Sequence, residues 1–170
     1  SSFAAVTDSP QSGKIYTEND WNTTSTLKRN PYYLSKTLAE KAATDFAKRE
    51  DFKQTGTELA FINPGLVIGP TYRSDVNGSV ETLQAILNGG FPAIINLGWA
   101  MVDVRDCAKA HILALGADLS KTQDGNNRFI CIDKCISMRE MIAVMKTQYP
   151  QFKYPTSSME GSFGTYLMYG

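Results

Sequence analysis

Residues 59–65, Leu59-Ala60-Phe61-Ile62-Asn63-Pro64-Gly65, form a short apolar run that ends in a turn signal. Such a run, bounded by Asn, Pro and Gly, is typical of a buried strand. The preceding segment, residues 32–49, is rich in Ala, Leu, Glu and Lys and predicts a helix. Asn30-Pro31 precedes this helix, with Asn expected as its cap and Pro in its first turn. A helix followed by a buried strand is the repeating unit of an α/β fold.

The same alternation continues along the chain. Further strands are predicted at 66–68, 100–102 and 128–132, and further helices at 80–87, 104–115 and 138–148. The expected helix caps are Ser79, Asp103 and Ser137, the last of which forms a capping box with Glu140. Residues 1–6 predict the end of a buried strand, and the polar residues 7–30 predict a long loop. Strands separated by helices favour an α/β fold with a largely parallel sheet.

Composition excludes several classes of function. Lys plus Arg and Asp plus Glu both number 17 among 170 residues, so the clustered positive charge of a nucleic-acid-binding protein is absent. The longest apolar stretch, residues 91–102, is broken by Pro92, Asn96 and Gly98 and predicts no membrane span. A single histidine leaves little for a metal site or a His-based triad, so no metal is expected.

Three cysteines and the first residues bear on the cellular compartment. Cys107, Cys131 and Cys135 are an odd number, and residues 1–6 lack the basic and apolar regions of a secretory signal. We therefore expect reduced, buried thiols and a cytoplasmic protein. The chain begins with Ser rather than Met, inside an expected strand, which suggests a fragment of a longer protein.

Tyr32 and Lys36 are the most informative pair for chemistry. Residues four apart on a helix share a face, so both side chains can point toward one place. The spacing alone is weak, because about 0.5 such pairs are expected by chance, and Tyr149 and Lys153 match it around a helix-breaking Pro150. The flanking string Tyr32-Tyr33-Leu34-Ser35-Lys36-Thr37-Leu38-Ala39-Glu40 is what distinguishes the first pair.

With this string the sequence resembles the extended short-chain dehydrogenase/reductase family, within the NAD-dependent epimerase/dehydratase superfamily. The nearest likeness is to its dihydroflavonol-4-reductase and aldehyde-reductase branch. Three further stretches resemble family motifs: Ser1-Ser2 the catalytic-serine strand, residues 63–70 the nicotinamide loop, and residues 102–111 the helix that begins Val-Asp-Val-Arg-Asp. Four motifs in the family's order make the resemblance specific from Ser1 to about Thr156.

The resemblance implies a partial Rossmann-like, doubly wound parallel sheet, corresponding to the carboxyl-terminal half, with part of a small substrate-binding region. Residues 1–70 would be the second half of the dinucleotide-binding domain, with the active-site helix. Residues 71–101, including Tyr72 and Trp99, would be a substrate-side segment, and residues 102–127 a helix returning to the core. Residues 128–170 would be an incomplete carboxyl-terminal substrate-side region.

The resemblance also implies reduction of an aldehyde or ketone by hydride transfer from NADPH, with NADH not excluded. Tyr32 would donate the proton, Lys36 would assist it and hold the nicotinamide ribose, and Ser2 would donate a hydrogen bond to the carbonyl. A phenol has a pKa of about 10, and an ammonium about 4 Å away stabilises the phenolate by roughly 4 kcal/mol at an effective dielectric near 20. The cofactor-binding residues implied are Tyr32, Lys36, Pro64, Gly65, Leu66 and Val67.

One family element is absent from the sequence. No Gly-x-x-Gly-x-x-Gly phosphate turn follows a strand, so we expect the phosphate-binding half to be missing. The alternatives are a sugar-nucleotide epimerase or dehydratase, a 3-beta-hydroxysteroid dehydrogenase-like enzyme, or a non-catalytic nucleotide-sensing protein on the same fold. The expected partners are a small carbonyl substrate and a second copy docked through the active-site helix, without nucleic acid or membrane.

Overall fold

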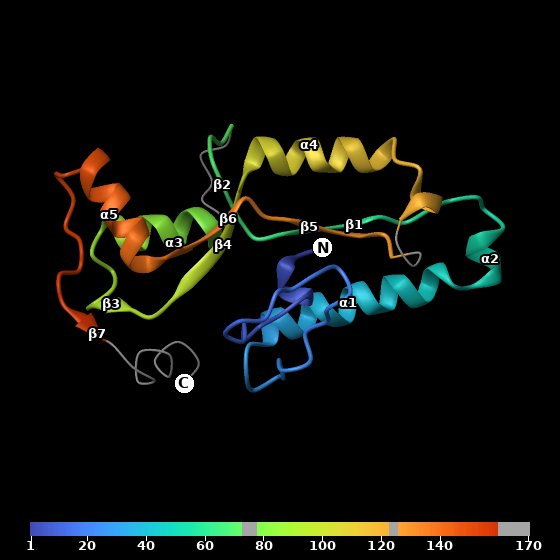
Figure 1. Ribbon diagram of the computed structural model, residues 1–170, viewed down its shortest axis with the longest axis horizontal. Helices are drawn as coiled ribbons and strands as arrows, with labels where there is room; N and C mark the ends of the chain where they lie inside the picture. The colour runs from blue at the N-terminus through green and yellow to red at the C-terminus, as the bar shows by residue number, and fades with distance from the viewer. Residues whose placement is uncertain (73–77, 123–125, 160–170) are drawn as a thin grey trace. The chain divides into compact units, whose positions relative to one another are not determined.

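The computed structural model describes residues 1–72, 78–122 and 126–159 (Figure 1). The chain forms two compact units that alternate along the sequence. Unit 1 consists of Ser1–Gly65 and Arg105–Cys131, and unit 2 consists of Leu66–Val104 and Ile132–Gly170. The functional boundaries expected from the sequence remain a prediction.

Unit 1 is built on two parallel strands. Its elements are η1 (Phe3–Ala5), α1 (Pro31–Ala47), α2 (Glu50–Lys53), β1 (Phe61–Pro64), α4 (Val104–Leu115, whose first residue belongs to unit 2), η2 (Leu119–Lys121) and β5 (Arg128–Cys131). β1 pairs with β5 in the register Phe61 to Arg128 and Pro64 to Cys131. Helices α1 and α4 lie on opposite sides of this pair, as Figure 1 shows.

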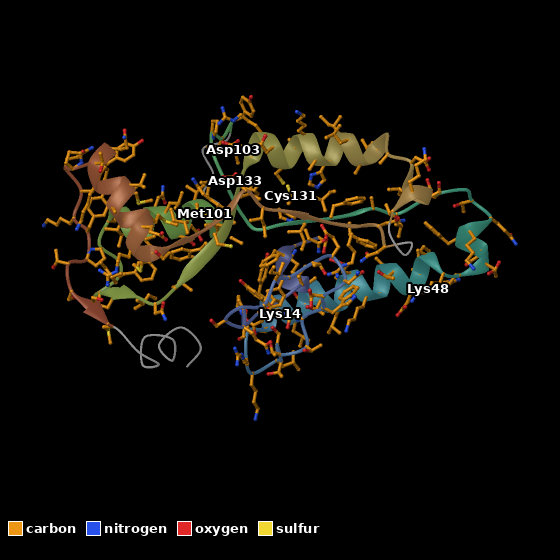
Figure 2. All side chains as sticks on the ribbon, in the orientation of Figure 1. Lys14, Lys48, Met101, Asp103, Cys131 and Asp133 are labelled. Atoms are coloured by element: carbon orange, nitrogen blue, oxygen red, sulfur yellow. The ribbon has the colours of Figure 1, made fainter. Side chains whose placement is uncertain are left out.

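Unit 2 contains the remaining elements: β2 (Leu66–Ile68), α3 (Gly78–Leu87), β3 (Ile94–Ile95), β4 (Gly98–Asp103), β6 (Lys134–Ser137), α5 (Met138–Gln148) and β7 (Ser158–Met159). β4 is central in a three-stranded sheet, parallel to β2 and antiparallel to β6. The backbone of β4 also forms a hydrogen bond outside the strand pairing, since Asp133 N–H donates to the Met101 carbonyl; Figure 2 labels both residues. The core gathers Ile86, Met138, Ile142 and their neighbours. Mainly parallel strands interleaved with helices confirm the predicted α/β fold class.

The expected strand at residues 1–6 is wrong within the described structure. Phe3–Ala5 form a 3₁₀ turn instead, and the Ser2 hydroxyl caps it by accepting a hydrogen bond from Ala4 N–H at 3.2 Å. The Asn22 side-chain amide donates to the Ala4 carbonyl at 2.9 Å. Backbone groups of this segment are therefore satisfied by its own cap and by a side chain, which replaces the strand ladder.

Two of the predicted helix caps are also wrong. α1 begins at Pro31 as expected, but Asn30 has a left-handed backbone, φ 55°, and makes no side-chain cap. Its amide donates instead to Asp8 at 2.8 Å, which anchors the long loop to the start of the helix. Ser79 lies inside α3, which begins at Gly78. The capping box of Ser137 and Glu140 at the start of α5 is confirmed.

Arg128, the first residue of β5, joins the segments of unit 1. Its side chain is 4% exposed and forms an ion pair with Glu40 of α1, whose side chain is 0% exposed. Its other nitrogens donate to the carbonyls of Glu18, Asp20 and Ala5, and its guanidinium lies 3.8 Å from the Trp21 ring centroid. An arginine suits this position because its planar fork offers five donors in several directions. The loop, η1, α1 and β5 therefore meet at one side chain.

We predict that Arg128→Met destabilises the protein by about 3–5 kcal/mol, because it leaves the Glu40 carboxylate buried without its counter-charge. Denaturant unfolding of the complete protein measures this. Arg49→Met is the matched control: Arg49 pairs with Asp51 and also lies over an aromatic ring, but both side chains are more than half exposed. It should cost at most about 1 kcal/mol. Equal losses in the two variants would contradict the prediction.

Candidate active site

Helix α1 presents the tyrosine and the lysine of the motif together. The Lys36 ammonium lies 5.4 Å from the centroid of the Tyr32 ring. Tyr32 is 57% exposed and its ring contacts Tyr33 edge-on. The i, i+4 spacing on a regular helix explains this approach, because such residues lie one turn apart on the same face. The arrangement offers a phenol hydroxyl and an ammonium to the same ligand.

Ser2 is held at the start of η1 with its hydroxyl in a defined role. Its backbone is extended and its Oγ accepts the hydrogen bond from Ala4 N–H. Because Oγ is the acceptor in that bond, the hydroxyl proton is not used by the cap and can be donated elsewhere. The neighbouring Ser1 differs, since its hydroxyl donates to the buried Glu40 carboxylate. Of the two serines, Ser2 is therefore the one suited to polarise a carbonyl.

Pro64 and Gly65 lie where β1 ends. Gly65 N–H donates to the Cys131 carbonyl at 3.3 Å, which extends the pairing of β1 with β5 by one step. Asn63, the residue before Pro64, donates from its side-chain amide to the Ser2 carbonyl at 3.0 Å. The turn of Ser2 and the carboxyl end of β1 are thus in contact, and carboxyl ends of parallel strands are where α/β folds bind ligands.

The remaining predicted cofactor residues belong to the other unit. Leu66 and Val67 lie in β2, where they pair with Met101 and Val102 of β4. By residue range, unit 1 contains Ser2, Tyr32, Lys36, Pro64 and Gly65, and unit 2 contains Leu66 and Val67.

Three residues that the sequence analysis left without a role contact the Ser2 segment. Glu40 and Asn63 bond to each other at 2.7 Å, and Arg128 bonds to Glu40. The sequence contains a signal that could have identified Glu40 as a functional residue. It follows Lys36 by four residues, the same helical step that joins Tyr32 and Lys36. Asn63 and Arg128 lie on strands, and no local spacing links them to the helix.

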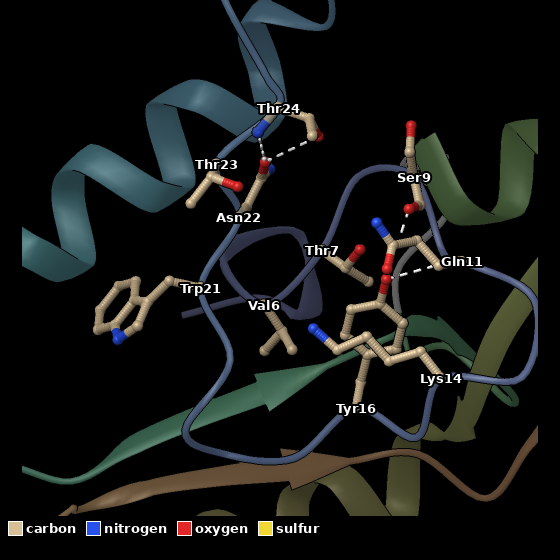
Figure 3. Close-up of a pocket in the computed structure, with 10 residues that line it drawn as sticks. All are labelled: Val6, Thr7, Ser9, Gln11, Lys14, Tyr16, Trp21, Asn22, Thr23 and Thr24. Atoms are coloured by element: carbon tan, nitrogen blue, oxygen red, sulfur yellow. Dashed lines mark hydrogen bonds between the residues drawn. The ribbon is translucent and has the colours of Figure 1, made fainter.

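Two cavities of unit 1 lie away from the predicted site residues. The smaller, about 80 Å³, is formed by the loop between η1 and α1 and is lined by ten residues that include Lys14, Tyr16 and Trp21 (Figure 3). A side-chain hydrogen bond from Thr7, together with Gln11 N–H, lowers the pKa of Tyr16. The larger, about 520 Å³, is lined by residues that include Trp21, Phe52 and Arg128.

The cysteines are all free, but only Cys107 is buried. Cys135 is exposed, so the expectation of three buried thiols is wrong there. Burial raises the pKa of the Cys131 thiol, at the end of β5 (Figure 2), and the nearby Cys107 acts in the same direction. A raised pKa disfavours the thiolate, which is the reactive form of cysteine.

The described residues offer neither a metal site nor a helix that spans a membrane. No group of three or more His, Cys, Asp or Glu side chains there is arranged to hold a metal ion. In the same part of the chain, no helix has the length and hydropathy needed to cross a membrane.

Comparison with known proteins identifies relatives along most of the chain, although no family model matches it. Cinnamoyl-CoA reductase 1 of Petunia hybrida is 33% identical over 128 residues, which are 75% of this chain and 35% of that protein. The crystal structure of Gre2 from Candida albicans in complex with NADPH is 32% identical, with a TM-score of 0.74 over 93% of this chain. Yeast methylglyoxal/isovaleraldehyde reductase Gre2, also complexed with NADPH, is 27% identical, with a TM-score of 0.75 over 95% of this chain.

The matched portion is only part of each relative. The chain spans less than half the length of the curated relatives it matches and about half of the two solved chains. Within that portion, both sequence and fold agree with the family that the motifs resemble. This chain belongs to the extended short-chain dehydrogenase/reductase family.

Proposed function

We propose that the chain carries the proton-donating part of an NADPH-dependent reductase of aldehydes or ketones. The observation that carries this proposal is the Lys36 ammonium set 5.4 Å from the ring of an exposed Tyr32, on the helix that packs against the turn of Ser2. The relatives named as reductases of cinnamoyl-CoA, methylglyoxal and isovaleraldehyde support the same chemistry.

The residues of unit 1 fit the nicotinamide end of the cofactor. Tyr32 and Lys36 supply a hydroxyl and an ammonium from one helix face, a donor set that suits the hydroxyls of a ribose. Pro64 ends β1 and Gly65 follows it, so both supply backbone at the end of that strand, and Leu66 and Val67 are the next residues along the chain, in unit 2. When bound, NADPH would supply the hydride; the chain's own residues would hold the carbonyl and deliver the proton.

In the proposed reaction the carbonyl oxygen gains negative charge and must be protonated. Ser2 would donate its hydroxyl proton to that oxygen as a hydrogen bond, which stabilises the developing charge. Tyr32 would transfer its phenolic proton to the oxygen. Lys36 would stabilise the phenolate left behind, because an ammonium a few ångströms away favours the anion.

The proposal includes the hypothesis that these 170 residues are part of a longer protein. We propose that the phosphates and adenosine of NADPH are bound by a half outside this sequence, as the missing glycine turn indicates. In its more specific form, the proposal assigns the protein a dihydroflavonol-like substrate, which is flat and largely apolar. Trp99, in the expected substrate-side segment, packs against the core of unit 2, whereas Tyr72 is fully exposed and available to a ligand.

The alternatives differ in the substrate that is converted, or in whether any substrate is converted. An epimerase or a hydroxysteroid dehydrogenase would use the same three side chains, so only substrate profiling separates these from a reductase. A nucleotide sensor would bind NADPH without turnover. The relatives named as reductases favour a reductase over these alternatives. A cytoplasmic location stays a prediction.

A homodimer through α1 also remains a proposal. Leu38 and Phe46 of this helix are 56% and 48% exposed, and the small Ala39 and Ala42 between them are exposed too. Such a face permits close helix approach. Sedimentation of the complete protein tests it, and a monomer at micromolar concentration would contradict it.

We predict that Tyr32→Phe in the complete protein lowers kcat for a small aldehyde by about 10²–10⁴-fold, because it removes the proton donor. NADPH affinity should change far less, since the ring and Lys36 remain. Tyr33→Phe is the matched control and should keep activity within about threefold. Steady-state kinetics with NADPH oxidation as readout measures both. Equal activity of Tyr32→Phe and the parent protein would exclude the proposed mechanism.

Lys36→Met should lower kcat by up to roughly 10²-fold, because an ammonium 5.4 Å from the ring centroid contributes at most about 3 kcal/mol at an effective dielectric near 20. It should also raise the Kd for NADPH, because the ribose loses a donor. Lys41→Met provides the control, as the Lys41 ammonium lies over the Trp21 ring at the same 5.4 Å but away from Tyr32. If the two variants behave alike, the assigned role of Lys36 is wrong.

A further inference from the structure

The interior of unit 1 contains a polar network that reaches the segment of Ser2. Both oxygens of the Glu40 carboxylate are engaged: Oε1 accepts from Arg128, and Oε2 accepts from the Ser1 hydroxyl and the Asn63 amide. Glu40, Asn63 and Arg128 are each 5% exposed or less. They come from α1, β1 and β5, so the network ties the Ser2 segment to all three elements.

The network holds the η1 turn by its backbone carbonyls. Asn63 donates to the carbonyl of Ser2 at 3.0 Å, and Arg128 donates to the carbonyl of Ala5 at 3.4 Å. These two carbonyls belong to the cap of the turn, Ser2, and to its last residue, Ala5. The backbone that carries Ser2 is therefore held by side chains that do not themselves belong to the turn.

The Asn63 side chain lowers the stability of unit 1 through one of its two polar atoms. Its side chain is fully buried, and its Oδ1 finds no hydrogen-bond partner in the part of the chain that the structure describes. A buried, unsatisfied carbonyl oxygen is unfavourable, and an apolar residue of similar size would avoid it. What such a residue could not supply is the Nδ2 group, which donates to both Ser2 and Glu40.

We propose that Asn63, supported by Glu40 and Arg128, is a positioning residue for the Ser2 hydroxyl. It acts by fixing the backbone of the capped turn so that this hydroxyl faces the substrate carbonyl. The inference rests on the proposed function, since it assigns the network a task only if Ser2 touches the substrate.

A double-mutant cycle in the complete protein tests it, with kcat for aldehyde reduction as the readout. Asn63→Ala should lower kcat by about tenfold or more in the parent protein. In a Ser2→Ala background the same change should lower kcat by less than about threefold, because the group being positioned is already gone. Asn127→Ala is the control: it removes an amide oxygen that accepts a hydrogen bond from the Thr122 hydroxyl at 2.8 Å, and it should leave kcat unchanged in both backgrounds.

A purely structural role would give the same loss from Asn63→Ala in both backgrounds, and that result overturns the inference. No loss from Asn63→Ala in the parent protein overturns it as well. If Asn63→Ala does not fold, Asn63→Ser, which keeps one donor, goes through the same cycle with the same criteria. A fully active Ser2→Ala variant overturns this inference but not the proposed function. The proposed function fails only if Tyr32→Phe is also fully active.

Discussion

The ion pair between Glu40 and Arg128 is the interaction on which unit 1 depends. Two charges removed from water are costly unless they are paired and hydrogen bonded, and here both conditions hold. The carboxylate comes from α1, the helix that carries Tyr32 and Lys36, and the guanidinium comes from β5, the strand that pairs with β1. Because the guanidinium also holds loop and turn carbonyls, the pair fixes the relative position of α1, β5 and the Ser2 turn.

This pair also explains why a negative charge on the proposed active-site helix is compatible with its chemistry. A carboxylate one turn from Lys36 would compete for the ammonium if it were unpaired. Glu40 instead turns into the interior of unit 1, where Arg128 neutralises it. The helix thus has a buried anchoring residue, Glu40, near its middle and an exposed tyrosine, Tyr32, in its first turn, with Lys36 over that ring.

The sequence predicts those parts of the structure that depend on local spacing. The helix at residues 31–47, the capping box at Ser137 and the approach of Lys36 to Tyr32 all follow from periodicity or neighbouring residue types. The 3₁₀ turn at Phe3–Ala5 could not be predicted in this way, because its carbonyls bond to Asn22, Asn63 and Arg128. The antiparallel strand β6 was missed for a related reason: Lys134 and Cys135 show no apolar alternation, and only pairing with β4 makes them a strand.

The long sequence separation of the Arg128 contacts has a consequence for how the protein folds. Arg128 lies 88 residues from Glu40 and 123 residues from Ala5. Contacts of such separation form late, since a long loop must close before they contribute. The phenol and the ammonium can take their places as soon as the helix has formed, whereas the backbone of the Ser2 turn gains its Arg128 contact only after β5 has been synthesised and has docked. A nascent chain that stops short of β5 would therefore hold two of the three proposed catalytic groups in order and leave the third without its support.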